Sequence, residues 1–163
     1  MIRGRIWKYG DHINTDLIIP GRYLDDYNPK SLSSHALEDL DPTFSKAMQP
    51  GDVIVAGKNF GCGSSREQAP LALRCAGVGA VVARSFARIF YRNAINIGLP
   101  LIVSNRAVDS LVDGETVIIE FELGRICKEE TGECLRFDPL PDFLLEILRK
   151  GGLVPCMRER LRE

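Results

Sequence analysis

The chain has 163 residues, of which 45% are hydrophobic and 26% are charged, and its net charge is −1 at pH 7. This composition fits a single globular domain over residues 1–163, and the charge balance excludes a nucleic-acid or membrane partner that is recognised through bulk charge. No apolar run approaches the roughly 20 residues of a membrane-spanning helix, and we find no signal peptide, so we expect a cytoplasmic protein.

The first predicted elements are a strand, a polar loop and a helix. We predict the strand over residues 2–8 and the loop over residues 11–16. Asn28 and Pro29 have the residue types of a helix N-cap and first helical position. The helix that they open should end at Asp41-Pro42, and one of its faces should carry Leu32, Ala36 and Leu40.

The middle of the chain alternates apolar strands with helices. We predict strands over residues 53–57, 80–83 and 101–103, a helix that ends near Gly77, and an amphipathic helix over residues 86–97 whose apolar stripe is core. This β-α-β-α-β order predicts an α/β fold with a partly parallel sheet and covering helices.

The last part of the chain has a different pattern. A hairpin is predicted from residues 116–121 and 125–129, and the turn at Thr131-Gly132 leads to a further strand over residues 134–137. A helix should follow over residues 142–150, and we expect the charged tail, residues 157–163, to be solvated.

Five cysteines are scattered through the chain without a Cys-x-x-Cys pair, at positions 62, 75, 127, 134 and 156. Their spacing favours neither a disulfide framework nor a zinc or iron–sulfur site built from this chain alone. We expect reduced and mostly buried thiols. Cys127 and Cys134 would be diagonal neighbours across the Thr131-Gly132 turn and contribute packing.

The strongest local signal is the run GCGSSRE at residues 61–67, between a predicted strand and a predicted helix. Glycines let the backbone approach a ligand closely, successive free N–H groups can bind an anion, and Arg66 offers a fork for a carboxylate. Ser64 and Glu67 also have capping-box spacing, although Pro70 favours a helix that begins later. A tight turn before a capped helix, without a ligand, explains the same residues.

The type of anion stays open at this point, because phosphate and carboxylate fit such a turn equally well. The phosphate-loop spacing is absent, which argues against a nucleoside triphosphate. Of the two histidines, we expect His12 to make a hydrogen bond that stabilises its loop, with a place in a site as the alternative, and His35 to be structural or exposed.

Four segments resemble one family in the same order along the chain. Residues 60–67 are similar to the Gly-x-Gly-Ser-Ser-Arg-Glu signature of the swivelling domain of the aconitase superfamily. Residues 11–16 resemble its Asp-x-x-x-Thr-Asp motif, residues 83–93 its Ser-Phe-Ala-Arg-Ile motif, and residues 147–153 the end of its stand-alone small subunits. The resemblance covers nearly the whole chain and implies a swivelling β/β/α domain.

The resemblance also implies an activity and a partner. The chain would be the small subunit of a hydro-lyase that is active only with a larger subunit, and that subunit would carry a [4Fe–4S] cluster, so that this chain binds no cofactor. Ser64 would be the base, and Ser65 would assist it. Arg66 would hold a carboxylate of a small dicarboxylate substrate, and Thr15 and Asp16 would line the site. Gln68 departs from the His of many relatives but follows the catalytic residues.

In this family the segment at residues 21–27 contacts the variable part of the substrate, which makes Tyr23, Leu24 and Asp25 candidate specificity residues. Homoaconitase-type subunits carry Arg where this chain has Asp25, and a carboxylate there would repel a third substrate carboxylate. Isopropylmalate, citramalate or a methylated malate therefore fits better than a tricarboxylate, and isopropylmalate is the leading candidate. Homoaconitase, citramalate and dimethylmalate hydro-lyases are alternatives, as is a stand-alone module that binds a small anion. Whether Asp25 faces substrate or solvent stays open.

Overall fold

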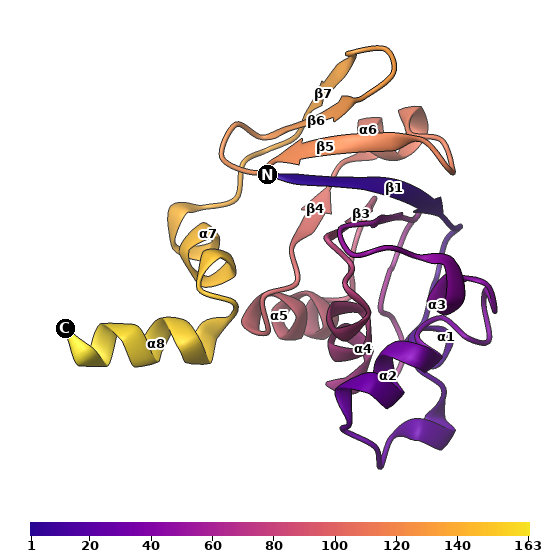
Figure 1. Ribbon diagram of the computed structural model, residues 1–163, viewed down its shortest axis with the longest axis vertical. Helices are drawn as coiled ribbons and strands as arrows, with labels where there is room; N and C mark the ends of the chain where they lie inside the picture. The colour runs from indigo at the N-terminus through magenta and orange to yellow at the C-terminus, as the bar shows by residue number, and fades with distance from the viewer.

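The strand β1 joins two kinds of sheet in the computed structural model, which describes residues 1–163 (Figure 1). The strands are β1 Ile2–Lys8, β2 Val53–Val55, β3 Ala80–Ala83, β4 Leu101–Val103, β5 Thr116–Glu120, β6 Arg125–Lys128 and β7 Cys134–Arg136. They form one seven-stranded sheet in the order β4-β3-β2-β1-β5-β6-β7. The pairs among β1 to β4 are parallel, and the pairs from β1 through β5 and β6 to β7 are antiparallel.

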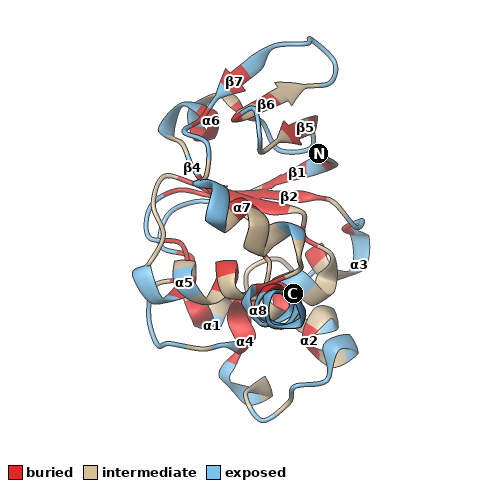
Figure 2. Cartoon of the chain, turned by 90° about the vertical axis from the view of Figure 1, so that its left-hand side faces the viewer, coloured by how far each residue is buried: buried red, intermediate tan, exposed pale blue.

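Both faces of the parallel strands are covered, one by α4 and α5 and the other by α6 with β5, β6 and β7, which explains why β2 and β3 are buried along their whole length. On β2, Ile54 packs in the core cluster that includes α4 and α5. Val53 and Val55 point to the opposite face and pack in the cluster under β5, β6 and β7. Figure 2 shows this buried layer between the two outer layers. The helices are α1 Thr15–Ile18, the 3₁₀ turn η1 Gly21–Tyr23, α2 Pro29–His35, α3 Phe44–Ala47, α4 Gln68–Ala76, α5 Arg88–Asn96, α6 Asn105–Ser110, α7 Asp142–Arg149 and α8 Leu153–Arg162.

The structure confirms the partly parallel α/β sheet and corrects several helix limits. Helix α2 ends at His35 instead of continuing to Asp41, because Leu37 has a left-handed backbone (φ +57°) and its amide donates to the carbonyl of Ile18 at 2.8 Å. Sequence analysis missed α6 altogether. The tail also forms a helix, α8, although its side chains are mostly exposed, as expected.

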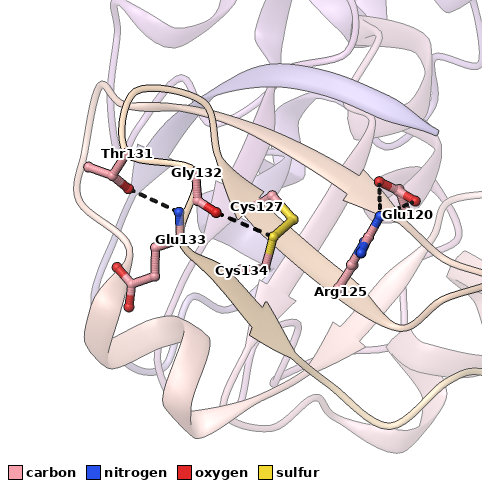
Figure 3. The surroundings of a disulfide bond; sticks show 7 residues. All are labelled: Glu120, Arg125, Cys127, Thr131, Gly132, Glu133 and Cys134. Atoms are coloured by element: carbon pink, nitrogen blue, oxygen red, sulfur yellow. Dashed lines mark hydrogen bonds and ion pairs between the residues drawn. A yellow bond between two sulfur atoms is a disulfide. The ribbon is translucent and has the colours of Figure 1, made fainter.

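The hairpin cysteines are a second correction. Cys127 and Cys134 lie directly opposite each other on β6 and β7, not diagonally, with 4.0 Å between their Cα atoms, and they form a disulfide (Figure 3). The next pair, Lys128 and Glu133, is hydrogen-bonded, so the cysteines occupy a non-hydrogen-bonded position, where facing side chains lie closest.

The other thiols, those of Cys62, Cys75 and Cys156, are free. Burial raises the pKa of the Cys75 thiol, which disfavours its thiolate form. No helix has the length and apolar character to cross a bilayer.

Candidate active site

Three chain segments meet where the parallel strands β1, β2 and β3 end. The amide of Gly61, after β2, donates to Ile13, after β1, at 2.8 Å. On the other side, Phe60 donates to Ser85, after β3, at 3.0 Å, and Ala87 donates back to Phe60 at 3.0 Å. In parallel sheets, ligands bind at this carboxyl edge, because the loops after neighbouring strands all emerge there.

Glycine is required at the centre of this junction. Gly61 has φ +82°, and a Cβ built on it would lie 2.2 Å from Cγ of Phe90. Phe90 is buried and packs edge-on against Phe60, with ring centroids 5.3 Å apart. Gly63 has φ +95° and more room. The two glycines turn the chain sharply, so that the following residues project outward from the sheet edge.

The turn after Gly61 presents a row of unused donors. Gly63, Ser64 and Ser65 are exposed, and no amide from Gly63 to Glu67 donates a hydrogen bond within the chain. Such a run of free N–H groups forms a concavity for an anion. The turn lines a cavity of about 390 Å³. The free donors that an anion site needs are therefore present beside the cavity.

Four of the predicted site residues line this cavity: Thr15, Ser64, Ser65 and Arg66. Thr15 is buried, and its hydroxyl donates to the backbone carbonyl of Ser64 at 2.9 Å. This bond fixes residues 63–67, which we call the serine turn, against α1. Asp16 is exposed, does not line the cavity, and forms an ion pair with Arg66, with 2.5 Å between its Oδ1 and Nη1 of Arg66. The same Nη1 donates to the carbonyl of Ile19 at 3.3 Å.

The predicted specificity residues Tyr23, Leu24 and Asp25 do not line the cavity. Tyr23 stacks on His35 with ring centroids 3.8 Å apart, and Asp25 is exposed. This segment is nonetheless tied to the site, because the buried Gln68 at the start of α4 donates through Nε2 to the carbonyl of Leu24 at 2.7 Å.

Two further expectations have a clear outcome. No capping box forms, because α4 begins at Gln68 and no side chain caps it; Ser64 and Glu67 lie in the preceding turn. His12 lies outside the cavity, with its Nδ1 at 3.1 Å from Nδ2 of Asn59, so the expected loop-stabilising contact is confirmed.

Sequence reasoning missed the contribution of α5 to the site. Arg88 and Asn93 line the cavity together with the serine turn. Both belong to the segment that was assigned to the core by its apolar stripe. The available signal was position: the Ser-Phe-Ala-Arg-Ile motif follows β3, the third of the adjacent parallel strands.

Comparison with known proteins places these three strand ends in one family. The model of the aconitase C-terminal domain matches residues 9–106, which include all three strand-end segments. This chain belongs to the aconitase C-terminal domain family. The match ends within α6, so β5, β6 and β7 lie outside the matched region, as does β1.

Relatives of known name span nearly the whole chain. A 3-isopropylmalate dehydratase small subunit from Methanopyrus kandleri is 54% identical over 97% of this chain and 93% of its own length. A methanogen homoaconitase small subunit from Methanothermobacter thermautotrophicus is 53% identical over 94% of this chain and 89% of its own. A crystal structure of a 3-isopropylmalate dehydratase from Methanocaldococcus jannaschii superposes with a TM-score of 0.91 at 46% identity, covering 98% of this chain and 94% of that one.

Proposed function

We propose that this chain is the small subunit of a 3-isopropylmalate dehydratase, which interconverts 2-isopropylmalate and 3-isopropylmalate in leucine biosynthesis. The observation that carries the proposal is the serine turn: Ser64 lies exposed among free backbone amides, beside Arg66, at the meeting point of three parallel strand ends. The names of full-length relatives and the superposed dehydratase structure support the choice of reaction.

The proposed reaction removes water from one isomer and adds it back in the opposite orientation. A base takes a proton from one carbon while hydroxide leaves the neighbouring carbon, and a double bond forms between them. Ser64 is our candidate for the base. A serine hydroxyl is a weak base at its ordinary pKa, so its alkoxide must be stabilised by nearby N–H groups and positive charge. The free amides from Gly63 to Glu67 and the guanidinium of Arg66 supply such groups.

The residues around Ser64 have supporting roles in this scheme. Thr15 fixes the carbonyl of Ser64, and Asp16 and the carbonyl of Ile19 orient Arg66 toward a substrate carboxylate. Ser65 adds a second hydroxyl at the cavity wall. Binding and orientation of the substrate, together with the transfer of one proton, are the work that we assign to this chain.

The departure of hydroxide needs a Lewis acid, and an iron–sulfur cluster with an open iron position supplies one. No group of three or more His, Cys, Asp or Glu side chains in this chain is placed to hold a metal, so its residues do not fit such a cluster. We therefore assign the [4Fe–4S] cluster to the large subunit and propose that the chain is active only in the complex.

The preference for a dicarboxylate such as isopropylmalate over the tricarboxylate of a homoaconitase rests on Asp25. Relatives named as isopropylmalate dehydratase and as homoaconitase are 54% and 53% identical to this chain, so overall identity does not discriminate between the two substrates. A carboxylate at position 25 disfavours a tricarboxylate that extends toward it. Homoaconitase activity is therefore the second candidate, and citramalate and dimethylmalate remain in the assay as further dicarboxylates.

Reconstitution tests the proposal. We expect the purified chain to contain no iron and to leave isopropylmalate unchanged, and the large subunit alone to be inactive. Mixing the two should produce the unsaturated dicarboxylate and then the second isomer. Stoichiometric iron and sulfide in the isolated chain, together with dehydratase activity, would contradict the proposal. Binding of small anions by the chain, without turnover in the mixture, would instead identify a stand-alone anion-binding module.

A further inference from the structure

Arg66 is not a free guanidinium in this structure. Its Nη1 is engaged by the carboxylate of Asp16 and the carbonyl of Ile19, and only 15% of its side chain is exposed. The charge of Arg66 is therefore largely balanced within the chain. A dicarboxylate substrate brings two negative charges to the cavity, and a guanidinium already shared with Asp16 cannot balance both.

Arg88 is the other charged residue that lines the cavity. It is exposed at the first position of α5, and no carboxylate of this chain forms an ion pair with it. Its side chain donates no hydrogen bond either, in contrast to Arg66. Arg88 therefore contributes the uncompensated positive charge of the cavity wall.

The backbone holds Arg88 in register with the serine turn. Ala87, the preceding residue, donates its amide to the carbonyl of Phe60 at 3.0 Å, and Phe60 directly precedes Gly61. The Phe60–Phe86 bridge continues the parallel pairing of β2 and β3 beyond the strands themselves. Arg88 and Ser64 thus follow neighbouring strand ends and face the same cavity across the turn.

We propose that Arg88 is a substrate-binding residue whose guanidinium takes one carboxylate of the substrate, while Arg66 takes the other. The inference rests on the proposed function and adds a residue to that site. The two arginines would then have different roles. Arg66 is held in place and its charge is partly neutralised, whereas Arg88 has free donors and can adjust its position as substrate enters. A planar guanidinium fits this task, because it can make two parallel hydrogen bonds to a carboxylate.

The test compares Arg88→Gln and Arg88→Lys in the complex with the large subunit, using isopropylmalate as the probe. We expect Arg88→Gln to raise KM at least about tenfold, with a smaller change in kcat, because a charged hydrogen bond to the substrate is lost. Arg88→Lys should recover part of this loss by restoring the charge without the fork.

Arg92→Gln is the matched control. Arg92 is also exposed on α5 but lines only the neighbouring cavity, of about 580 Å³, which Arg88 borders as well. This variant should keep wild-type KM and kcat. Titration of each variant against the large subunit separates substrate binding from assembly, and we expect equal affinities for all of them.

An Arg88→Gln complex with wild-type KM would overturn the inference, and so would a rise in KM that follows entirely from weaker assembly. A contact between Arg88 and the large subunit would produce that second result. Failure of the proposed function has a different signature: the wild-type complex would turn over neither isopropylmalate nor the related substrates, and this inference would fall with it.

Discussion

The two halves of the sheet differ in where the loops after their strands emerge. In the half formed by β1, β2, β3 and β4, all strands run in the same direction, so the segments after β1, β2 and β3 emerge at one edge and bond to one another. In the half formed by β5, β6 and β7, successive strands reverse direction, and tight turns connect them. Figure 1 shows these strands as a separate layer on the far side of β1 from α4 and α5.

This difference explains where chemistry can collect. The parallel half brings residues distant in sequence, such as Thr15, Ser64 and Arg88, to one cavity. The family match begins after β1, covers β2, β3, β4 and the loops at their ends, and stops before β5. We propose that the parallel half carries the site and that the antiparallel half contributes to the stability of the fold by covering one face of the sheet.

Substitutions of glycine are expected to give the largest difference between the two halves of the sheet. Gly61→Ala would force a Cβ into Phe90 at a residue with φ +82°. We expect it to lower the free energy of unfolding by about 3 kcal/mol, from backbone strain and overpacking together. Activity in the complex should be abolished, because the serine turn follows this residue. Chemical denaturation and the reconstituted assay measure the two effects.

Gly132→Ala is the matched control in the antiparallel half. Gly132 also has a positive φ, +75°, but nothing lies within 4 Å of an added Cβ. We expect a loss of about 1 kcal/mol and unchanged activity. Equal effects of the two substitutions would show that the close packing at Gly61 is not what shapes the site.

A charge reversal at position 25 tests whether the parallel half also determines which substrate the complex prefers. At about 4 Å and an effective dielectric near 20, each charge interaction is worth on the order of 4 kcal/mol before desolvation. Asp25 is exposed, so we expect solvent to reduce this to about a tenfold change. The wild-type complex should prefer isopropylmalate over homoaconitate in kcat/KM, and Asp25→Arg should narrow or invert that preference.

Asp138→Arg makes the same charge change at an exposed position that follows β7. Its ratio of kcat/KM values should equal that of the wild type. If Asp25→Arg also left the ratio untouched, Asp25 would not contact substrate. Tyr23, Leu24 and the large subunit would then be the places to look for specificity.

The disulfide gives the smallest expected effect on activity. The Cys127→Ser/Cys134→Ser double variant should keep activity within about twofold of wild type, because the hairpin lies outside the site. Its free energy of unfolding should fall by on the order of 2 kcal/mol, since the bridge closes a short loop between cysteines seven positions apart. A large loss of turnover in the folded variant would place part of the catalytic machinery in the antiparallel half.

Local residue types were enough to predict part of this molecule. The strand over residues 2–8, the strands at 80–83 and 101–103, and the glycine and serine turn all follow from short-range patterns, and the structure has them as predicted. Resemblance to the family then identified Thr15, Ser64, Ser65 and Arg66, which the fold brings to one cavity.

Features that depend on long-range contacts were missed. The end of α2 is set by the bond from Leu37 to Ile18, and the disulfide by the register of β6 and β7. The place of Arg88 depends on the bond from Ala87 to Phe60, which no local pattern reveals. In each case the partner lies on another element, so the sequence pattern around the residue does not contain the signal.

The most direct test of the central claim is the turnover of Ser64→Ala in the complex with the large subunit. The account predicts a fall in kcat of at least about a hundredfold, the usual minimum for loss of a general base, with KM within a few-fold of wild type. Ser34→Ala, an exposed serine on α2 away from the cavity, should leave both constants unchanged. Turnover of Ser64→Ala within a few-fold of wild type would contradict the account, because the proton would then be removed by another group.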